Sequence, residues 1–396
     1  MKKRWMKVLG ILMAGTMAVG SLTACGGDKK ADGDAAGSDV SIAVICSSAG
    51  QNDNGYNQSA VDGAKKAAEE LGVEYKVVEP TNGVPQALES LAEDGYDVIF
   101  NLEYDFEALI SGTGGAKPIA EMYPDTTFVC VNDNPNQDES GNVIHENVIS
   151  ALFDVHQASY VAGALSVLVN ENAETLFGTE NYKFTAPDNG GRAMGFIGGT
   201  NSNGITVFSY GFIEGMNHVA EELGVNYDYY AKYDAGFADS ATGSTVAGTY
   251  YNQGANIIFS VAGSVGDGVA AKAKEEGKLM IHVDANKDAQ QPGHILTSVL
   301  KNTEVPVYEI TKAAVEGKIG EMERVQSYTL ASGAASITDM AEISKYVQES
   351  GKEKWEEIKT YIADLEKQIG DGTITVTNAQ SGEEFDPSAC THVTIK

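Results

Sequence analysis

Residues 40–73 combine a strand, a loop and a helix in the order of one α/β unit. The β-branched apolar run at 40–45 has the composition of a buried parallel strand. A polar loop follows at 46–55, and alanine and leucine recur at helical spacing after it, up to a predicted stop at Gly72. In an open α/β sheet such a loop lies at the carboxyl end of its strand, where ligands bind.

The composition of this loop narrows the kind of ligand. It has neither the dinucleotide-binding glycine pattern nor the Gly-Lys-Ser/Thr of a P-loop. It offers instead the carboxylate of Asp53, the carboxamide of Asn54 and, just beyond it, Asn57 and the aromatic ring of Tyr56. These groups suit a neutral polar ligand with a flat face better than a phosphate. Asp53 has an alternative role as the cap of the following helix, because aspartate is favoured there.

A repeat indicates that the chain contains two such units. The hexapeptide AEELGV occurs at 68–73 and again, unchanged, at 220–225. Each copy ends a helix that follows a strand and a loop of small polar residues. The matching position in the strand–helix order favours two related lobes over a chance identity.

Alternating strand and helix patterns continue through most of the chain and predict doubly wound parallel sheets. The fold class is therefore α/β, with two lobes joined by a hinge. We expect the first lobe at 40–153 plus about 287–330, and the second at 154–286 plus about 331–374. Residues 375–396 form a C-terminal extension of no evident role, and 170–191 are expected to be a surface loop or hairpin. A helix is expected at 106–122 and a helical stretch, broken near Gly351, at 343–369.

The amino terminus is typical of a lipoprotein. A basic region is followed by an apolar stretch at 8–19 that is too short to cross a bilayer well. Leu-Thr-Ala-Cys at 22–25 then resembles a bacterial lipobox, which implies cleavage after residue 24 and lipid on Cys25; an ordinary secretory signal is the alternative. Residues 25–39 have the composition of a flexible tether. We therefore expect the protein on the extracytoplasmic face of the cell membrane, anchored by lipid.

Charge and residue types exclude several functions. The net charge of −29 argues against nucleic acid as a partner. No metal-type cysteine spacing, H-E-x-x-H or G-x-S-x-G motif occurs, so we expect no cofactor and no enzymatic activity.

Several phrases together resemble the basic membrane protein family of lipoproteins. These proteins are substrate-binding components of ABC importers, typified by purine-nucleoside receptors. The phrases occur in family order: NDNGYNQS at 52–59, GYDVIF at 95–100, YPD at 123–125, SYVAG at 159–163, GFIGG at 195–199, Phe208 with Gly211, Phe212 and Gly215, VAG at 261–263, VD at 283–284, and LTSVLK at 296–301.

The resemblance implies a type I periplasmic-binding-protein architecture that captures a nucleoside between its lobes and docks on an ABC permease. Tyr56 stands where the family has a stacking phenylalanine, with Asp53 and Asn57 beside it. Asp284 and Lys301 would hold the ribose hydroxyls; a structural ion pair is the alternative for these two. Either Phe208 or Phe259 would lie on the opposite face of the base. Gly263 would let the backbone approach the ligand closely.

This chain departs from the family at the end of the fourth strand. An aspartate used in base recognition is usual there, but Asn132 takes its place and Asp133 follows. Because successive strand residues face opposite sides, we expect only one of them in the cleft. The ligand could accordingly be another small molecule, such as a sugar or a modified base. A lipoprotein sensor and, less favoured, a nucleoside-cleaving enzyme are the other functions left open.

Overall fold

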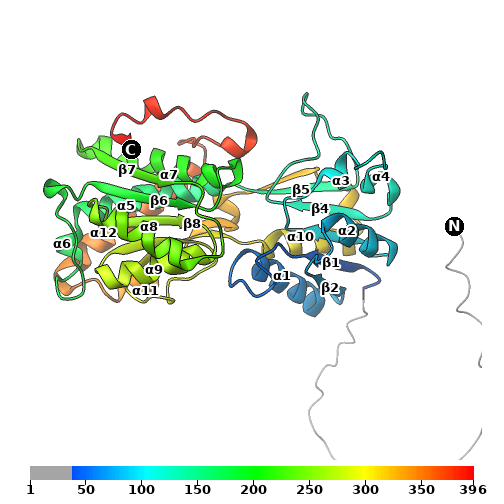
Figure 1. Cartoon of the computed structure of the whole chain (residues 1–396), viewed down its shortest axis with the longest axis horizontal. Coiled ribbons are helices and arrows are strands. Elements are labelled where there is room, and N and C mark those ends of the chain that lie inside the picture. Colours follow the sequence, from blue (N-terminus) through cyan, green and yellow to red (C-terminus); the bar gives the residue numbers. More distant parts are fainter. Residues whose placement is uncertain (1–37) are drawn as a thin grey trace, which may run out of the picture. The chain divides into compact units, whose positions relative to one another are not determined.

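The computed structural model describes residues 38–396 (Figure 1). The expected signal peptide, the lipidation site at Cys25 and most of the expected tether lie outside these residues.

The first lobe is built on a parallel sheet of order β11-β5-β4-β3-β1-β2. Its strands are β1 (Ser41–Ile45), β2 (Glu74–Val78), β3 (Val98–Asn101), β4 (Thr127–Val131), β5 (Val148–Phe153) and β11 (Val325–Tyr328). The central strands are apolar and buried, as expected for a sheet covered on both faces.

The second lobe is built on a sheet of order β12-β10-β9-β8-β6-β7-β13. Its strands are β6 (Ala193–Gly198), β7 (Tyr227–Lys232), β8 (Ile257–Val261), β9 (Leu279–Asp284), β10 (Ile295–Lys301), β12 (Ala335–Ile337) and β13 (Val393–Ile395). Only β12 runs antiparallel to its neighbour among these strands. The prediction of α/β lobes with parallel sheets is confirmed.

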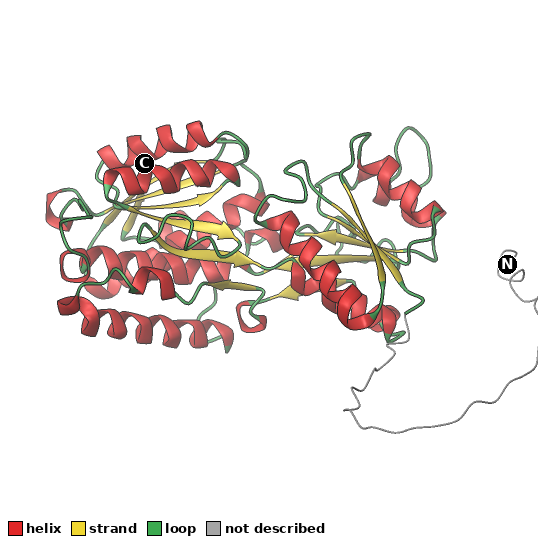
Figure 2. Ribbon diagram, turned by 90° about the horizontal axis from the view of Figure 1, so that it is seen from below, coloured by secondary structure: helices red, strands yellow, loops and turns green. Residues whose placement is uncertain are grey.

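Helices lie on both faces of each sheet (Figure 2). In the first lobe, α1 (Tyr56–Leu71) and α10 (Glu304–Val315) contact each other, and α2 (Val84–Glu93), α3 (Glu107–Ile110) and α4 (Ile119–Met122) form a second cluster. The second lobe contains α5 (Val155–Glu171), α6 (Ala173–Leu176), α7 (Asn203–Leu223), α8 (Ser240–Asn252), α9 (Ser264–Glu276), α11 (Ala341–Ser344) and α12 (Lys352–Gly370). Short 3-10 turns are η1 (Pro187–Asn189), η2 (Ile319–Glu321), η3 (Leu330–Ser332), η4 (Glu349–Gly351), η5 (Ala379–Ser381) and η6 (Pro387–Ala389).

Glycines let α5 and α7 approach closely. A Cβ atom on Gly211 would lie 2.3 Å from the His156 carbonyl oxygen, and one on Gly215 would lie 1.9 Å from that of Tyr160. These distances are shorter than any tolerable contact, so the two helices could not pack this way with larger residues. The glycines in the 208–215 and 159–163 phrases thus have a packing role in the second lobe.

Strand pairing divides the chain differently from the boundaries expected from the sequence. The sequence predicts 287–301 to be part of the first lobe, but β10 pairs with β9 in the second sheet. The C-terminal residues are not a separate extension, because β13 pairs with β7 at the edge of the same sheet. After the second lobe begins, the chain returns to the first lobe once, with α10, η2 and β11.

Two local expectations have different outcomes. The helix predicted at 106–122 is wrong: it divides into α3 and α4, because Gly112, Gly114 and Gly115 take left-handed backbone conformations between them. The break expected near Gly351 is confirmed, since η4 ends there and α12 begins at Lys352.

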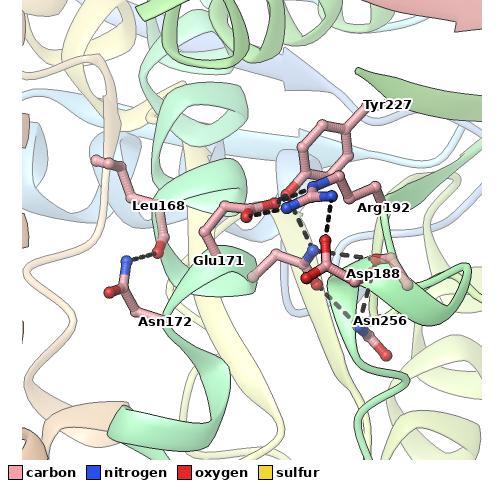
Figure 3. A network of polar contacts seen from close by, with 9 residues as sticks. Leu168, Glu171, Asn172, Asp188, Arg192, Tyr227 and Asn256 are labelled. Carbon is pink, nitrogen blue, oxygen red and sulfur yellow. Dashed lines mark hydrogen bonds and ion pairs between the residues drawn. The ribbon is translucent and has the colours of Figure 1, made fainter. Parts of the chain in front are cut away.

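The segment 170–191 is packed rather than a free surface loop. Phe177 and Tyr182 are buried, and the Tyr182 hydroxyl donates to the Gly293 carbonyl at 2.7 Å. A polar network fixes its ends at the amino-terminal edge of the second sheet (Figure 3). There Arg192 binds both carboxylate oxygens of Glu171 at 2.9 Å, and the Tyr227 hydroxyl donates to the same carboxylate at 2.6 Å.

Candidate functional site

Three side chains from separate elements meet where the lobes adjoin. The Lys301 Nζ atom lies 3.6 Å from Oδ1 of Asp284 and 4.9 Å from the centre of the Tyr56 ring. Asp284 ends β9, Lys301 ends β10 and Tyr56 begins α1, so all three lie at the carboxyl edge of a parallel sheet or at the helix that follows one. All three are residues predicted from the sequence for the ligand site, and the structure brings them together.

The pair of charges is largely removed from water. The side chain of Lys301 is 7% exposed and that of Asp284 is 17% exposed. At 3.6 Å the Lys301 Nζ and Asp284 Oδ1 atoms form an ion pair but are too far apart for a normal hydrogen bond, so both groups retain hydrogen-bonding capacity. Asp284 also has a left-handed backbone with φ of 73°, an uncommon conformation outside glycine that turns the chain sharply at the end of β9.

Tyr56 is held by its hydroxyl as well as its ring. The hydroxyl donates to the Val131 carbonyl oxygen at 3.1 Å, at the end of β4. Burial raises the pKa of Tyr56 well above its usual value, and the nearby Tyr104 and Asp284 act in the same direction. The phenol is therefore neutral, and the hydrogen bond fixes the ring next to Lys301.

Asp53 and Asn57 serve the start of α1. The Asp53 carboxylate accepts from the backbone N–H groups of Gly55, Asn57 and Gln58 at 2.9–3.0 Å. Asn57 is fully buried and bonds the backbone N–H and hydroxyl of Ser47 at 2.8 and 2.9 Å. The capping role is therefore the one the structure supports for Asp53, and Asn57 holds the loop to the helix.

Asn132 and Asp133 differ in burial at the end of β4. Asn132 is 2% exposed, has φ of 67°, and its amide nitrogen donates to the Tyr104 hydroxyl. Asp133 is half-buried, and burial raises the pKa of its carboxyl. A Cβ atom on Gly204, at the start of α7, would lie 3.7 Å from the Asn132 amide nitrogen. Asn132 is thus the member of the pair that faces the second lobe.

The two phenylalanine candidates are separated by their surroundings. Both side chains are fully buried, but the Lys301 Nζ lies 5.3 Å from the Phe208 ring centre, so Phe208 borders the charged pair from within the core. Phe259 is buried among Phe196, Phe208 and Phe212, at centroid distances of 5.6, 6.2 and 5.4 Å. Phe259 is accordingly a core residue behind Phe208. Gly263 has φ of 52° and precedes α9.

An open groove of about 500 Å³ is lined by residues next to Tyr56, Asp284 and Lys301 in the chain, but not by these three side chains themselves. Both lobes line it, with Asn54, Gly55 and Gln58 on one side and Asn286, Lys287 and Gln290 on the other. Gly55 also lies beside Asp284, because a Cβ atom built on it would be 3.6 Å from the Asp284 Cβ. Asn54 therefore belongs to the groove rather than to the immediate surroundings of Lys301.

A comparison with known families decides the class of protein. Residues 40–368 match the family model described as Bmp, ABC transporter substrate-binding protein PnrA-like. The chain belongs to the Bmp family. Membership confirms the coarse predictions of an ABC transporter substrate-binding protein and of a non-enzymatic class.

Several known proteins resemble the chain over most of its length. The ABC transporter nucleoside-binding protein BmpA of Lactococcus lactis is 26% identical over 401 residues, covering 95% of this chain and 99% of the relative. An uncharacterized lipoprotein of Pyrococcus abyssi is 25% identical, and the similarity covers 88% of this chain and 86% of that protein. Basic membrane protein A1 of Borrelia garinii is 25% identical, and the similarity covers 72% of this chain and 76% of that protein.

Solved structures agree with the fold. A solute-binding protein of an ABC transporter system from Aeropyrum pernix superimposes with a TM-score of 0.69 at 22% identity, covering 89% of this chain and 95% of that one. A second solute-binding protein, from Conexibacter woesei, superimposes with a TM-score of 0.60 at 17% identity, covering 86% of this chain and 99% of that one. None of the helices in the described part of this Bmp protein is both long and apolar enough to span a membrane.

Sequence reasoning missed two residues at this site. Tyr104, which contacts Asn132, follows β3 and could have been found by the rule that loops at strand carboxyl ends carry binding groups. Gln380 donates to the Asn132 carbonyl oxygen at 2.7 Å from the C-terminal segment. No local pattern marks Gln380, because its partner is 248 positions away.

Proposed function

We propose that this Bmp protein captures a nucleoside, with a purine base, and delivers it to an ABC permease. The observation that carries the proposal is the meeting of Tyr56, Asp284 and Lys301. A ribose presents vicinal hydroxyls that a carboxylate can accept from and an ammonium can donate to. A base presents a flat face that an aromatic ring can stack on, which is worth about 1–3 kcal/mol per base.

The charged pair suits hydroxyls better than an ionic ligand. Asp284 and Lys301 neutralise each other, so neither a free anion nor a free cation meets an excess of opposite charge there. Both groups are largely out of water, which strengthens each hydrogen bond that they make. The nucleoside-binding relative in Lactococcus lactis supports the same ligand class, and its similarity extends over nearly the full chain.

The position of the site supports closure of the lobes on the ligand. Tyr56 comes from the first lobe, whereas Asp284, Lys301 and Phe208 come from the second. A ligand held by both sets favours the closed arrangement, which would be the form that docks on the permease. Lipid on Cys25 would keep the protein at the extracytoplasmic face of the membrane, and the name of the Pyrococcus abyssi relative, a lipoprotein, supports such an anchor.

Isothermal titration calorimetry of the full-length protein tests the ligand class. Guanosine, adenosine and inosine are titrated separately, with ribose, glucose and the free bases as comparison ligands. We expect heat from at least one purine nucleoside and weaker or no heat from ribose or base alone, because each lacks half of the contacts. Heat from glucose but from no nucleoside would refute the proposal. Chromatography of the recovered nucleoside should show it chemically unchanged.

A further inference from the structure

The C-terminal segment is anchored on the second lobe at its far end. Strand β13 pairs with β7, and the Lys396 backbone N–H donates to the Tyr229 carbonyl oxygen at 2.9 Å. Cys390 and Val393 are buried just before this end. The last residues are thus a strand of the second sheet and not a free tail.

The middle of the same segment is held along α7. The Thr377 backbone N–H and hydroxyl both donate to the Glu214 carboxylate, at 3.0 and 2.5 Å. The Phe385 ring stacks on Tyr210 with a centroid distance of 4.4 Å and an interplanar angle of 7°. Residues 377–385 therefore lie against one helix of the second lobe at both of their ends.

Between these two anchors the turn η5 presents Gln380 to the first lobe. The Asn378 side chain accepts from the N–H groups of Gln380 and Ser381, and Ala379 is buried, so the turn is fixed. The Gln380 Nε2 atom then donates to the Asn132 carbonyl oxygen at 2.7 Å. This hydrogen bond joins the two lobes.

Asn132 is a position where one such bond has consequences for the site. Its backbone is left-handed, and its N–H already donates to the Ala151 carbonyl oxygen at 2.8 Å. With its carbonyl oxygen held by Gln380, both backbone hydrogen-bonding groups are engaged and the direction of its side chain is set. That side chain faces the start of α7 across the lobe boundary.

We propose that residues 377–385 are a clasp between the lobes, in which Gln380 is a positioning residue for Asn132. The proposal rests on the proposed function for its ligand and adds a determinant of ligand release. Opening the lobes breaks the bond from Gln380, and closing them restores it. The clasp therefore favours the closed form and retards dissociation without contacting the ligand.

Stopped-flow release of a bound purine nucleoside tests the clasp. For Gln380→Ala and for the isosteric Gln380→Glu, which cannot donate, we expect the dissociation rate to rise about 3- to 10-fold, the equivalent of one net hydrogen bond, with little change in the association rate. Gln380→Lys, a long side chain that again donates, should restore slow release. Release from all three variants at the unmodified rate would overturn the proposal.

Gln348→Ala is the matched control. Gln348 is also half-buried and its Nε2 donates to the Glu174 and Thr175 carbonyl oxygens at 2.9 and 2.8 Å, but entirely within the second lobe. A general loss of packing would accelerate release in this variant too, whereas the clasp predicts no change. Equal acceleration in the Gln348 and Gln380 variants would contradict a specific role of Gln380.

A measurement without ligand separates this proposal from the proposed function. Spin labels on the exposed positions Ser90, on α2, and Ala271, on α9, report the distance between the lobes by pulsed electron resonance. We expect Gln380→Ala to increase the population at longer distances, and Gln348→Ala to leave the distribution unchanged. An unmodified protein that binds no nucleoside would refute only the proposed function. An unaltered distance distribution in Gln380→Ala would refute the clasp.

Discussion

The Lys301 ammonium lies 3.6 Å from the Asp284 carboxylate, at the ends of two adjacent strands of the second sheet. A buried ion pair of this kind adds little to stability, because desolvation offsets most of the attraction. Its placement beside Tyr56 of the other lobe instead gives it a use in binding.

Removing the Asp284 carboxylate should weaken nucleoside binding. For Asp284→Ala we expect a loss of about 1.5–3 kcal/mol in binding free energy, because charged hydrogen bonds to the ribose disappear and Lys301 is left unpaired. Calorimetric titration measures it. The exposed Asp125, in the turn before β4, provides the control variant Asp125→Ala. An affinity equal to that of the unmodified protein would remove Asp284 from the site.

The Tyr56 ring and hydroxyl should have different effects. Tyr56→Leu removes the aromatic face, and we expect affinity to fall by about 1–3 kcal/mol. Tyr56→Phe keeps the face but loses the bond to Val131, so it should lower the free energy of unfolding by about 1 kcal/mol and leave affinity nearly unchanged. Titration and urea denaturation of both variants measure these effects. The reverse pattern would show that the hydroxyl, not the ring, serves the ligand.

Asp53 should prove to be a structural residue. Asp53→Ala frees three backbone N–H groups at the start of α1, and we expect the free energy of unfolding to fall by about 1 kcal/mol. Asp53→Asn retains one acceptor oxygen and should lose less. Affinity per folded molecule should stay close to that of the unmodified protein. A large loss of affinity at unchanged stability would instead place Asp53 in contact with the ligand.

Lys278, which lies away from the candidate site, should make the free energy of unfolding depend on pH. It is 6% exposed, and burial lowers its pKa to about 8 while its Nζ donates to the Asn256 oxygen at 2.7 Å. The unfolded chain has the ordinary higher pKa, so between pH 8 and 10 it binds more protons than the folded chain. The lysine contribution therefore becomes more favourable to folding as the pH rises through this range.

The variant Lys278→Met isolates that effect from the other groups that titrate there. We expect the stability of the unmodified protein, relative to the variant, to increase between pH 7.5 and pH 9.5 on the order of 1 kcal/mol. Urea denaturation at both pH values gives the difference in free energy of unfolding between the unmodified protein and Lys278→Met at each pH. A difference that stays constant, or that decreases with pH, would contradict the lowered pKa.

The sequence predicted the elements whose signals are local. The strands predicted at 40–45 and 127–131 are apolar runs whose side chains are buried on both faces of the sheet. The two AEELGV copies end α1 and α7 as expected. Tyr56, Asp284 and Lys301 were found because each lies at a strand or helix end within a family phrase.

Features set by distant contacts were beyond reach of local patterns. Strand β10 joins the second sheet through pairing with β9, and no residue within 295–301 encodes that choice by itself. Phe208 and Phe259 are both apolar residues that become fully buried, and only the packing shows that Phe208 is the one beside Lys301, with Phe259 behind it. The C-terminal segment has no periodicity, so its place along α7 follows only from contacts such as that of Phe385 with Tyr210.

The most direct test of the account is a crystal structure of the protein with a purine nucleoside bound. The account predicts the ribose hydroxyls within hydrogen-bonding distance of the Asp284 carboxylate and the Lys301 ammonium, and the base against the Tyr56 ring. A nucleoside bound elsewhere, with Asp284 and Lys301 still paired only to each other, would contradict it.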